Sequence, residues 1–90
     1  MVCNLCRVSG RVQGVFFRAS TQQQARLLNV SGYAKNCFDG SVEVLVCGEE
    51  DNVLRLCEWL GTGPEFARVE HVDCSEHAFM DMNGFSIKQD

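Results

Sequence analysis

The pattern of apolar and polar positions along the chain predicts two helices that alternate with short strands. Apolar side chains recur every three or four positions from about Phe17 to Leu28 and again over residues 49 to 60, which is the spacing of an amphipathic helix. Runs rich in β-branched and other apolar residues indicate strands. These expected strands cover residues 2–9, Tyr33 to Cys37, Ser41 to Cys47, about Ala67 to Cys74, and Phe85 to Ile87.

Turn sequences separate these elements and set their order. Asp39-Gly40, between two expected strands, is a strong hairpin signal because this pair accepts positive φ. The run Gly61-Thr62-Gly63-Pro64 ends the second helix. The resulting order is β-α-β-β-α-β with a small terminal strand, and two helices of this size cover only one face of a sheet. We therefore expect one domain over residues 1–90, a ferredoxin-like α+β sandwich with an antiparallel sheet and both helices on one face.

Length, hydropathy and cysteine content narrow the class of protein. Ninety residues suffice for one core, no apolar run approaches the ~20 residues of a membrane span, and Asn4 and Arg7 interrupt the apolar stretch that a signal peptide needs. We therefore expect a cytoplasmic protein with no membrane partner, whose six cysteines are reduced and mostly buried. Cys3 and Cys6 are an odd number of positions apart in one strand, so they point to opposite faces and no metal site is expected.

Charge is distributed unevenly along the chain, whose net charge is −4. Residues 1–45 carry five positive and two negative side chains, whereas residues 46–90 carry three positive and ten negative ones. The acidic balance argues against a nucleic-acid partner. The positive charge that gathers in the first half would attract a small anion there.

Residues 10–18, with the sequence GRVQGVFFR, join the first strand to the first helix and suggest where such an anion would bind. Gly10 and Gly14 let the backbone turn tightly and approach a ligand. The first N–H groups of a helix lack partners within it and favour an anion, and Arg18 would add a planar fork of donors that matches phosphate oxygens. A plain glycine turn followed by a surface arginine fits the same residues, so both interpretations stay open.

Missing motifs narrow the chemistry further. The loop lacks the Gly-Lys-Ser/Thr ending of a nucleotide triphosphate loop, no arginine stands six positions after a cysteine, and His71 and His77 are isolated. Acyl phosphates still suit such a site, because their carboxylate leaving group departs unprotonated and phosphoryl transfer needs mainly positioning and charge neutralisation. The amide of Asn36 is a candidate for orienting the attacking water, although Asn at this position also fits a simple turn former.

The loop and the segments after it resemble the acylphosphatase family. The resemblance rests on GRVQGVFFR at residues 10–18, GYAKN at residues 32–36 and DGSVEV at residues 39–44, and it continues in order to Phe85 and Ile87. It implies a ferredoxin-like fold and hydrolysis of small acyl phosphates to a carboxylate and inorganic phosphate, with no metal or cofactor.

The resemblance also implies a role for individual residues. Arg18 corresponds to the catalytic arginine that binds phosphate, and Asn36 to the residue that positions water. The phosphate cradle corresponds to Gln13, Gly14, Val15, Phe16 and Phe17. Inorganic phosphate or sulfate would occupy the same loop, and a monomer is expected. A noncatalytic anion-binding regulatory module, like the acylphosphatase-like domain of a hydrogenase-maturation carbamoyltransferase, and a metal chaperone or RNA-binding module on the same fold are the alternatives.

Overall fold

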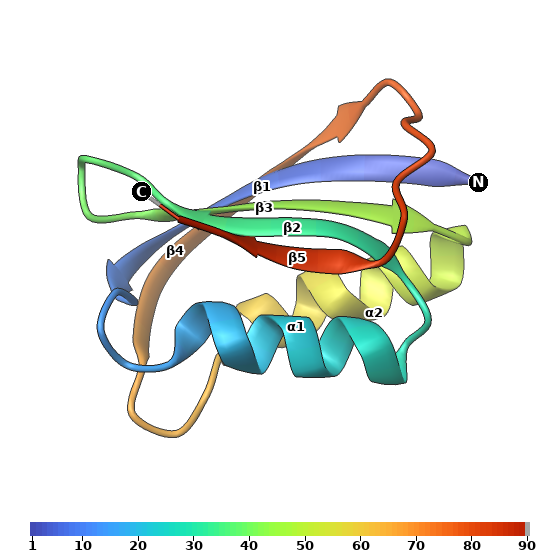
Figure 1. The fold of residues 1–90 in the computed structure, drawn as a ribbon. Helices are drawn as coiled ribbons and strands as arrows, with labels where there is room; N and C mark the ends of the chain where they lie inside the picture. Colours follow the sequence, from blue (N-terminus) through green and yellow to red (C-terminus); the bar gives the residue numbers. More distant parts are fainter. Residues whose placement is uncertain (90) are drawn as a thin grey trace.

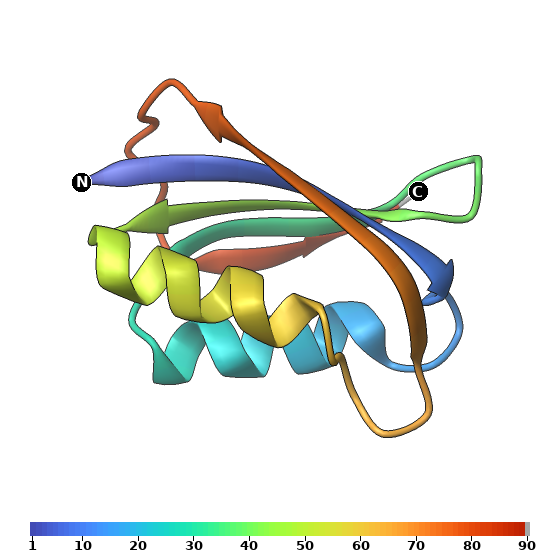
Figure 2. The same ribbon diagram turned by 180° about the vertical axis from the view of Figure 1, so that it is seen from behind.

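A computed structural model describes residues 1–89 and contains a five-stranded sheet and two helices. Both helices lie against one face of the sheet (Figure 1), and the reverse view shows α2 below β1 and β4 (Figure 2). This arrangement confirms the expected ferredoxin-like α+β sandwich. In chain order the elements are β1 (Val2–Arg11), α1 (Phe17–Leu27), β2 (Ser31–Asn36), β3 (Val42–Gly48), α2 (Glu50–Leu60), β4 (Arg68–His77) and β5 (Phe85–Lys88).

The sheet order is β4-β1-β3-β2-β5, and the last strand corrects one expectation. The pairs β1–β3, β1–β4 and β2–β3 are antiparallel as expected, but β5 pairs parallel with β2. The segment after β4 crosses to the far edge of the sheet before β5 begins, so β5 arrives running in the direction of β2 (Figure 1). The sheet is therefore mixed, and the end of β5 lies beside the end of β2.

The main core lies between the sheet and the helices. Phe17, Thr21 and Ala25, which share the apolar face of α1, are all buried. Phe17 and Ala25 belong to the same core cluster as the fully buried valines of β3. This packing explains why the spacing of apolar residues identified α1 correctly. A smaller cluster on the other face of the sheet contains Leu45. Within residues 1–89, no helix is long and apolar enough to cross a membrane.

Disulfide bonds replace four of the six expected thiols. Cys3 bonds to Cys47 and Cys6 bonds to Cys74, while Cys37 and a cysteine of α2 remain free. The expectation of reduced cysteines is thus wrong for both bonded pairs, because each pair occupies directly opposed positions on neighbouring antiparallel strands. The strand alternation itself is confirmed, since Cys3 and Cys6 belong to clusters on opposite faces of the sheet.

We expect loss of the Cys3–Cys47 bond to destabilise the protein markedly. The bond closes a separation of 44 residues, for which the chain-entropy model gives about 4 kcal/mol. Urea unfolding of the double variant Cys3→Ala/Cys47→Ala should show this loss, whereas Cys37→Ala, which breaks no bond, should change stability far less. Equal effects in the two proteins would contradict the prediction.

Candidate active site

The loop between β1 and α1 holds its backbone in two left-handed conformations. Gly14 has φ of 75°, and Phe16, which directly precedes α1, has φ of 63° and ψ of 25°. Across residues 1–89, the backbone N–H groups of 14–17 donate to no backbone acceptor. The first turn of α1 also contains no acidic side chain, unlike that of α2, which contains Glu50 and Asp51. The start of α1 is therefore the helix terminus that suits an anion.

Phe16 is an unusual residue for its backbone conformation. A left-handed conformation costs an L side chain about 1–2 kcal/mol, and this side chain is 77% exposed, so it buries little apolar surface in return. We expect Phe16→Gly to raise the free energy of unfolding by up to about 1 kcal/mol, after subtracting the backbone entropy of glycine. Chemical denaturation measures the change. The control Phe66→Gly, at a residue 72% exposed with no positive φ, should instead lower stability, and a matching decrease at Phe16 would contradict the prediction.

Arg18 lies in the first turn of α1 and is oriented by the terminal strand. Its Nη1 donates a hydrogen bond of 2.8 Å to the backbone carbonyl of Lys88 in β5. The parallel pairing of β5 with β2 places Lys88 opposite Lys35, one position before Asn36. The loop, the end of β2 and the end of β5 consequently meet at one end of the molecule, on the left in Figure 1.

Arg18 and Asn36 line the same cavity, which has a volume of about 270 Å³. The remaining lining residues come from the loop, from the start of α1 and from β5. They are Val12, Gly14, Phe16, Phe17, Ala19 and Ile87. A small anion in this cavity would therefore meet a guanidinium group, the start of a helix and a side-chain amide.

Gln13 connects the loop to the β2–β3 hairpin. Its Nε2 donates hydrogen bonds of 2.8 Å to the backbone carbonyls of both Cys37 and Ser41. These two residues flank the turn directly after Asn36, so the Gln13 amide ties the position of Asn36 to that of the loop. Hydrogen bonds from the hydroxyl and backbone N–H of Ser41 also lower the pKa of Asp39 and brace the turn.

The structure thus brings together most of the residues that the sequence singled out. Gly14, Phe16, Phe17, Arg18 and Asn36 line one cavity. The side chain of Val15 is buried, so only its backbone is available to a ligand. The side chain of Gln13 bonds to the hairpin instead of facing an anion. Sequence reasoning missed the carbonyl of Lys88 entirely, because no local pattern reveals which strand will lie beside Arg18.

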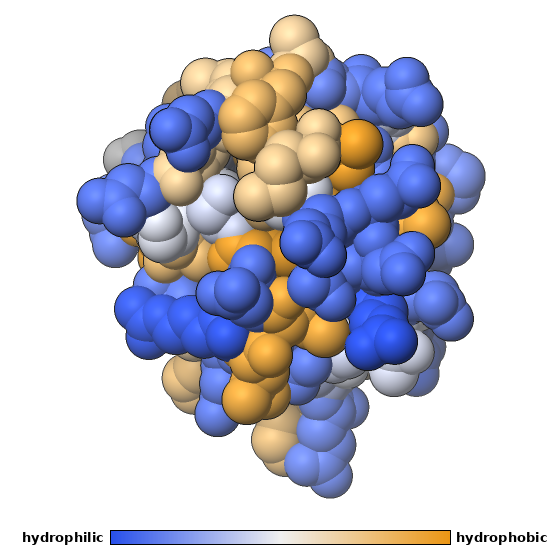
Figure 3. Space-filling model, turned by 90° about the vertical axis from the view of Figure 1, so that its right-hand side faces the viewer, coloured by the Kyte–Doolittle hydropathy of each residue, from blue (hydrophilic) through white to orange (hydrophobic). Residues whose placement is uncertain are grey.

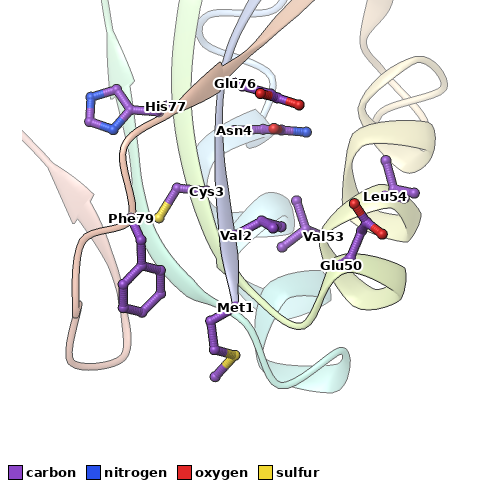
Figure 4. A pocket seen from close by; sticks show the side chains of 10 residues that line it. All are labelled: Met1, Val2, Cys3, Asn4, Glu50, Val53, Leu54, Glu76, His77 and Phe79. Carbon is purple, nitrogen blue, oxygen red and sulfur yellow. The ribbon is translucent and has the colours of Figure 1, made fainter.

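A cavity at the opposite end of the molecule has the wrong charge for phosphate. Exposed apolar side chains gather on this end (Figure 3), and they include Met1, Leu54 and Phe79. The cavity there has a volume of about 300 Å³ and contains Glu50 and Glu76 but no arginine or lysine (Figure 4). Two carboxylates repel an anion, so this cavity suits phosphate less well than the cavity that Arg18 lines.

Comparisons with known proteins agree with this geometry. The acylphosphatase family model matches residues 5–87. An acylphosphatase from Colwellia psychrerythraea is 48% identical over 86 residues, which cover 96% of this chain and 97% of that protein. The structure of an acylphosphatase from Coxiella burnetii matches with a TM-score of 0.93 at 41% identity, covering 97% of this chain and 92% of that one. HypF from T. kodakarensis matches all of this chain with a TM-score of 0.85 at 30% identity, but the match covers 12% of HypF. The chain therefore belongs to the acylphosphatase family of hydrolases.

Proposed function

We propose that residues 1–90 form one domain that hydrolyses small acyl phosphates at the cavity between the loop and β2. The observation that carries this proposal is the convergence of Arg18, Asn36 and the start of α1 on one cavity. Those groups supply a charge for the phosphate and an amide for water. The products are a carboxylate and inorganic phosphate.

Phosphate binding is the task of the loop and Arg18. The backbone N–H groups of Gly14, Val15, Phe16 and Phe17 donate to the phosphate oxygens, together with the backbone of Gln13, and Arg18 adds charge-assisted hydrogen bonds. In a loose transition state, negative charge is spread over the equatorial oxygens, and fixed donors stabilise it without reorganisation. The hydrogen bond from Arg18 to the Lys88 carbonyl supports this role because it restricts where the guanidinium can lie.

Water activation is the task of Asn36. Its amide oxygen accepts a hydrogen bond from the water, which attacks phosphorus directly as the bond to the carboxylate oxygen breaks. The proton of the water passes to a phosphate oxygen, so no protein base is required. The anchoring of the hairpin by Gln13 supports this role, since misplacing the water by about 1 Å would cost roughly a hundredfold in rate.

The acyl group has room on the other side of Asn36. A second cavity of about 800 Å³ borders this residue and contains Gln13, Lys35 and Phe38. A substrate whose phosphate lies by Arg18 would extend its acyl chain into this space. A cavity of this volume places little restriction on the acyl group, so we expect several acyl phosphates to be hydrolysed and not one alone.

Turnover of benzoyl phosphate in the presence of EDTA tests the proposal. We expect release of phosphate without added metal, with inorganic phosphate as a competitive inhibitor. Folded protein that binds phosphate but releases none from benzoyl or acetyl phosphate would overturn the enzymatic role. That outcome would favour a noncatalytic anion-binding module, for which the match to a small part of HypF is the supporting observation.

A further inference from the structure

Three cysteine sulfur atoms converge between α2 and the sheet, apart from the phosphate loop. Cys6 of β1 and Cys74 of β4 are register partners, and Cys57 of α2 packs against the same core. The Sγ atoms of all three residues lie within 4.8 Å of one another, and those of Cys6 and Cys57 are 3.6 Å apart. The proposed hydrolysis of acyl phosphates does not use these three cysteines, which lie outside the lining of the candidate cavity.

The alternation of β1 explains why the cluster forms on this side of the sheet. Val2 and Asn4 point toward α2, whereas Cys3 points away from it (Figure 4). Cys6 follows the same alternation as Asn4, so both face Cys57. The amide Nδ2 of Asn4 donates a hydrogen bond of 3.7 Å to the Cys57 sulfur. Burial raises the pKa of the Cys57 thiol, and the hydrogen bond from Asn4 partly offsets this shift because it favours the thiolate.

Thiol–disulfide exchange is one use of such a cluster, but the geometry does not suit it. A thiolate attacks a disulfide in line with the bond that breaks. With a disulfide bond of about 2.05 Å, an aligned Cys57 sulfur 3.6 Å from Cys6 would stand roughly 5.6 Å from the Cys74 sulfur. The sulfur of Cys57 lies within 4.8 Å of both, so it stands beside the bond.

We propose instead that, once the Cys6–Cys74 bond is reduced, Cys6, Cys57 and Cys74 bind one Cu(I) ion through their three sulfur atoms. Three sulfurs around one ion stand about 4 Å apart when each metal–sulfur bond is about 2.3 Å. The Cys6 and Cys57 sulfurs, 3.6 Å apart, already approach this spacing, and reduction lets the Cys6 and Cys74 sulfurs, now bonded to each other, separate toward it. Within residues 1–89, no histidine, carboxylate or further cysteine joins the group. Zinc usually takes four ligands, and this group offers three. Thiolates also select the soft ion Cu(I), for which three sulfur ligands are enough.

The oxidation state of the Cys6–Cys74 pair determines how many sulfur ligands are available to the ion. A dithiol reductant supplies two electrons and two protons, which break the disulfide and leave two thiols, and the reductant becomes a disulfide itself. Binding of Cu(I) to the three thiols then releases three protons to solvent. Oxidation of the pair removes two of the three ligands. Because Cys57 and Cys74 are only partly buried, the ion can reach them from solvent.

Copper titration of a protein that retains only these cysteines tests the proposal. The variant Cys3→Ala/Cys37→Ser/Cys47→Ala removes the competing thiols, and its circular dichroism and cooperative urea unfolding show that it is folded. After anaerobic reduction, competition with a chromogenic Cu(I) chelator should show one tightly bound ion. Adding Cys57→Ser should weaken binding by at least the ~10–100-fold that follows loss of a supporting group at a metal site. Turnover should be unchanged, since Cys57 lies outside the candidate active site.

Equal copper affinity with and without Cys57, or equal affinity in the oxidised and reduced proteins, would overturn the proposal. If the triple variant does not fold, the reduced wild-type protein answers instead. Copper should then protect Cys57 and Cys74 from alkylation, measured by peptide mass spectrometry, and Cys37 should remain reactive. Unprotected Cys57 would refute the site. Neither readout depends on the proposed hydrolysis, so failure of one proposal leaves the other standing.

Discussion

Arg18→Ala should lower kcat/KM for benzoyl phosphate by at least about 10²–10³-fold, the loss that follows removal of one donor to a charged transition state. The guanidinium is the only arginine side chain that lines the candidate cavity within the described residues. Without it, only the backbone N–H groups of the loop would remain to stabilise the negative charge of the phosphate. Steady-state kinetics on folded protein, with phosphate inhibition measured beside them, check this prediction.

Two further variants separate charge from shape at this position. Arg18→Lys should recover little activity, because an ammonium group cannot bond to the Lys88 carbonyl and still present a planar fork to phosphate. Arg26→Lys changes an exposed arginine in the last turn of the same helix and should leave kinetics close to wild type. Arg18→Ala activity within tenfold of wild type would refute the assignment.

Local sequence patterns were enough to locate the helices and strands. The pairing of β5 and of the cysteines depended instead on contacts between residues far apart in the sequence. The helical spacing of Phe17, Thr21 and Ala25 was enough to locate α1, because these side chains meet the same core. The parallel pairing of β5 with β2 had no local signal, since a four-residue strand carries no information about its neighbour. The disulfides were missed for the same reason. Cysteine partners are determined by strand register, and Cys6 and Cys74 are 68 positions apart.

In the candidate site, too, some features follow from the local sequence, whereas one depends on a contact between distant segments. Left-handed Gly14 and the position of Arg18 follow from the loop sequence itself. Gln13 was expected in the phosphate cradle, and its side chain bonds to the carbonyls of Cys37 and Ser41. That bond joins two segments which the sequence presents separately. It also gives the proposed water-positioning role of Asn36 a structural basis that neither segment has alone.

Asn36→Ala should lower kcat roughly a hundredfold while phosphate still inhibits with nearly its wild-type constant. The reason is that misplacement of a reacting water costs about this factor, whereas the phosphate donors belong to the loop and to Arg18. A residue that acts in the transition state changes kcat, and one that binds the ground state changes KM. Single-turnover and steady-state measurements with benzoyl phosphate separate the two effects.

Matched variants show whether Asn36 acts through water or through the hairpin. Asn52→Ala removes an amide from α2, outside the lining of the candidate cavity, and should leave both constants unchanged. Asn36→Asp keeps an oxygen acceptor but adds a negative charge beside the phosphate, so it should weaken phosphate inhibition, which Asn36→Ala should not. If Asn36→Ala instead abolished phosphate inhibition and kept kcat, Asn36 would be a binding residue, and water would have to be positioned by the loop itself.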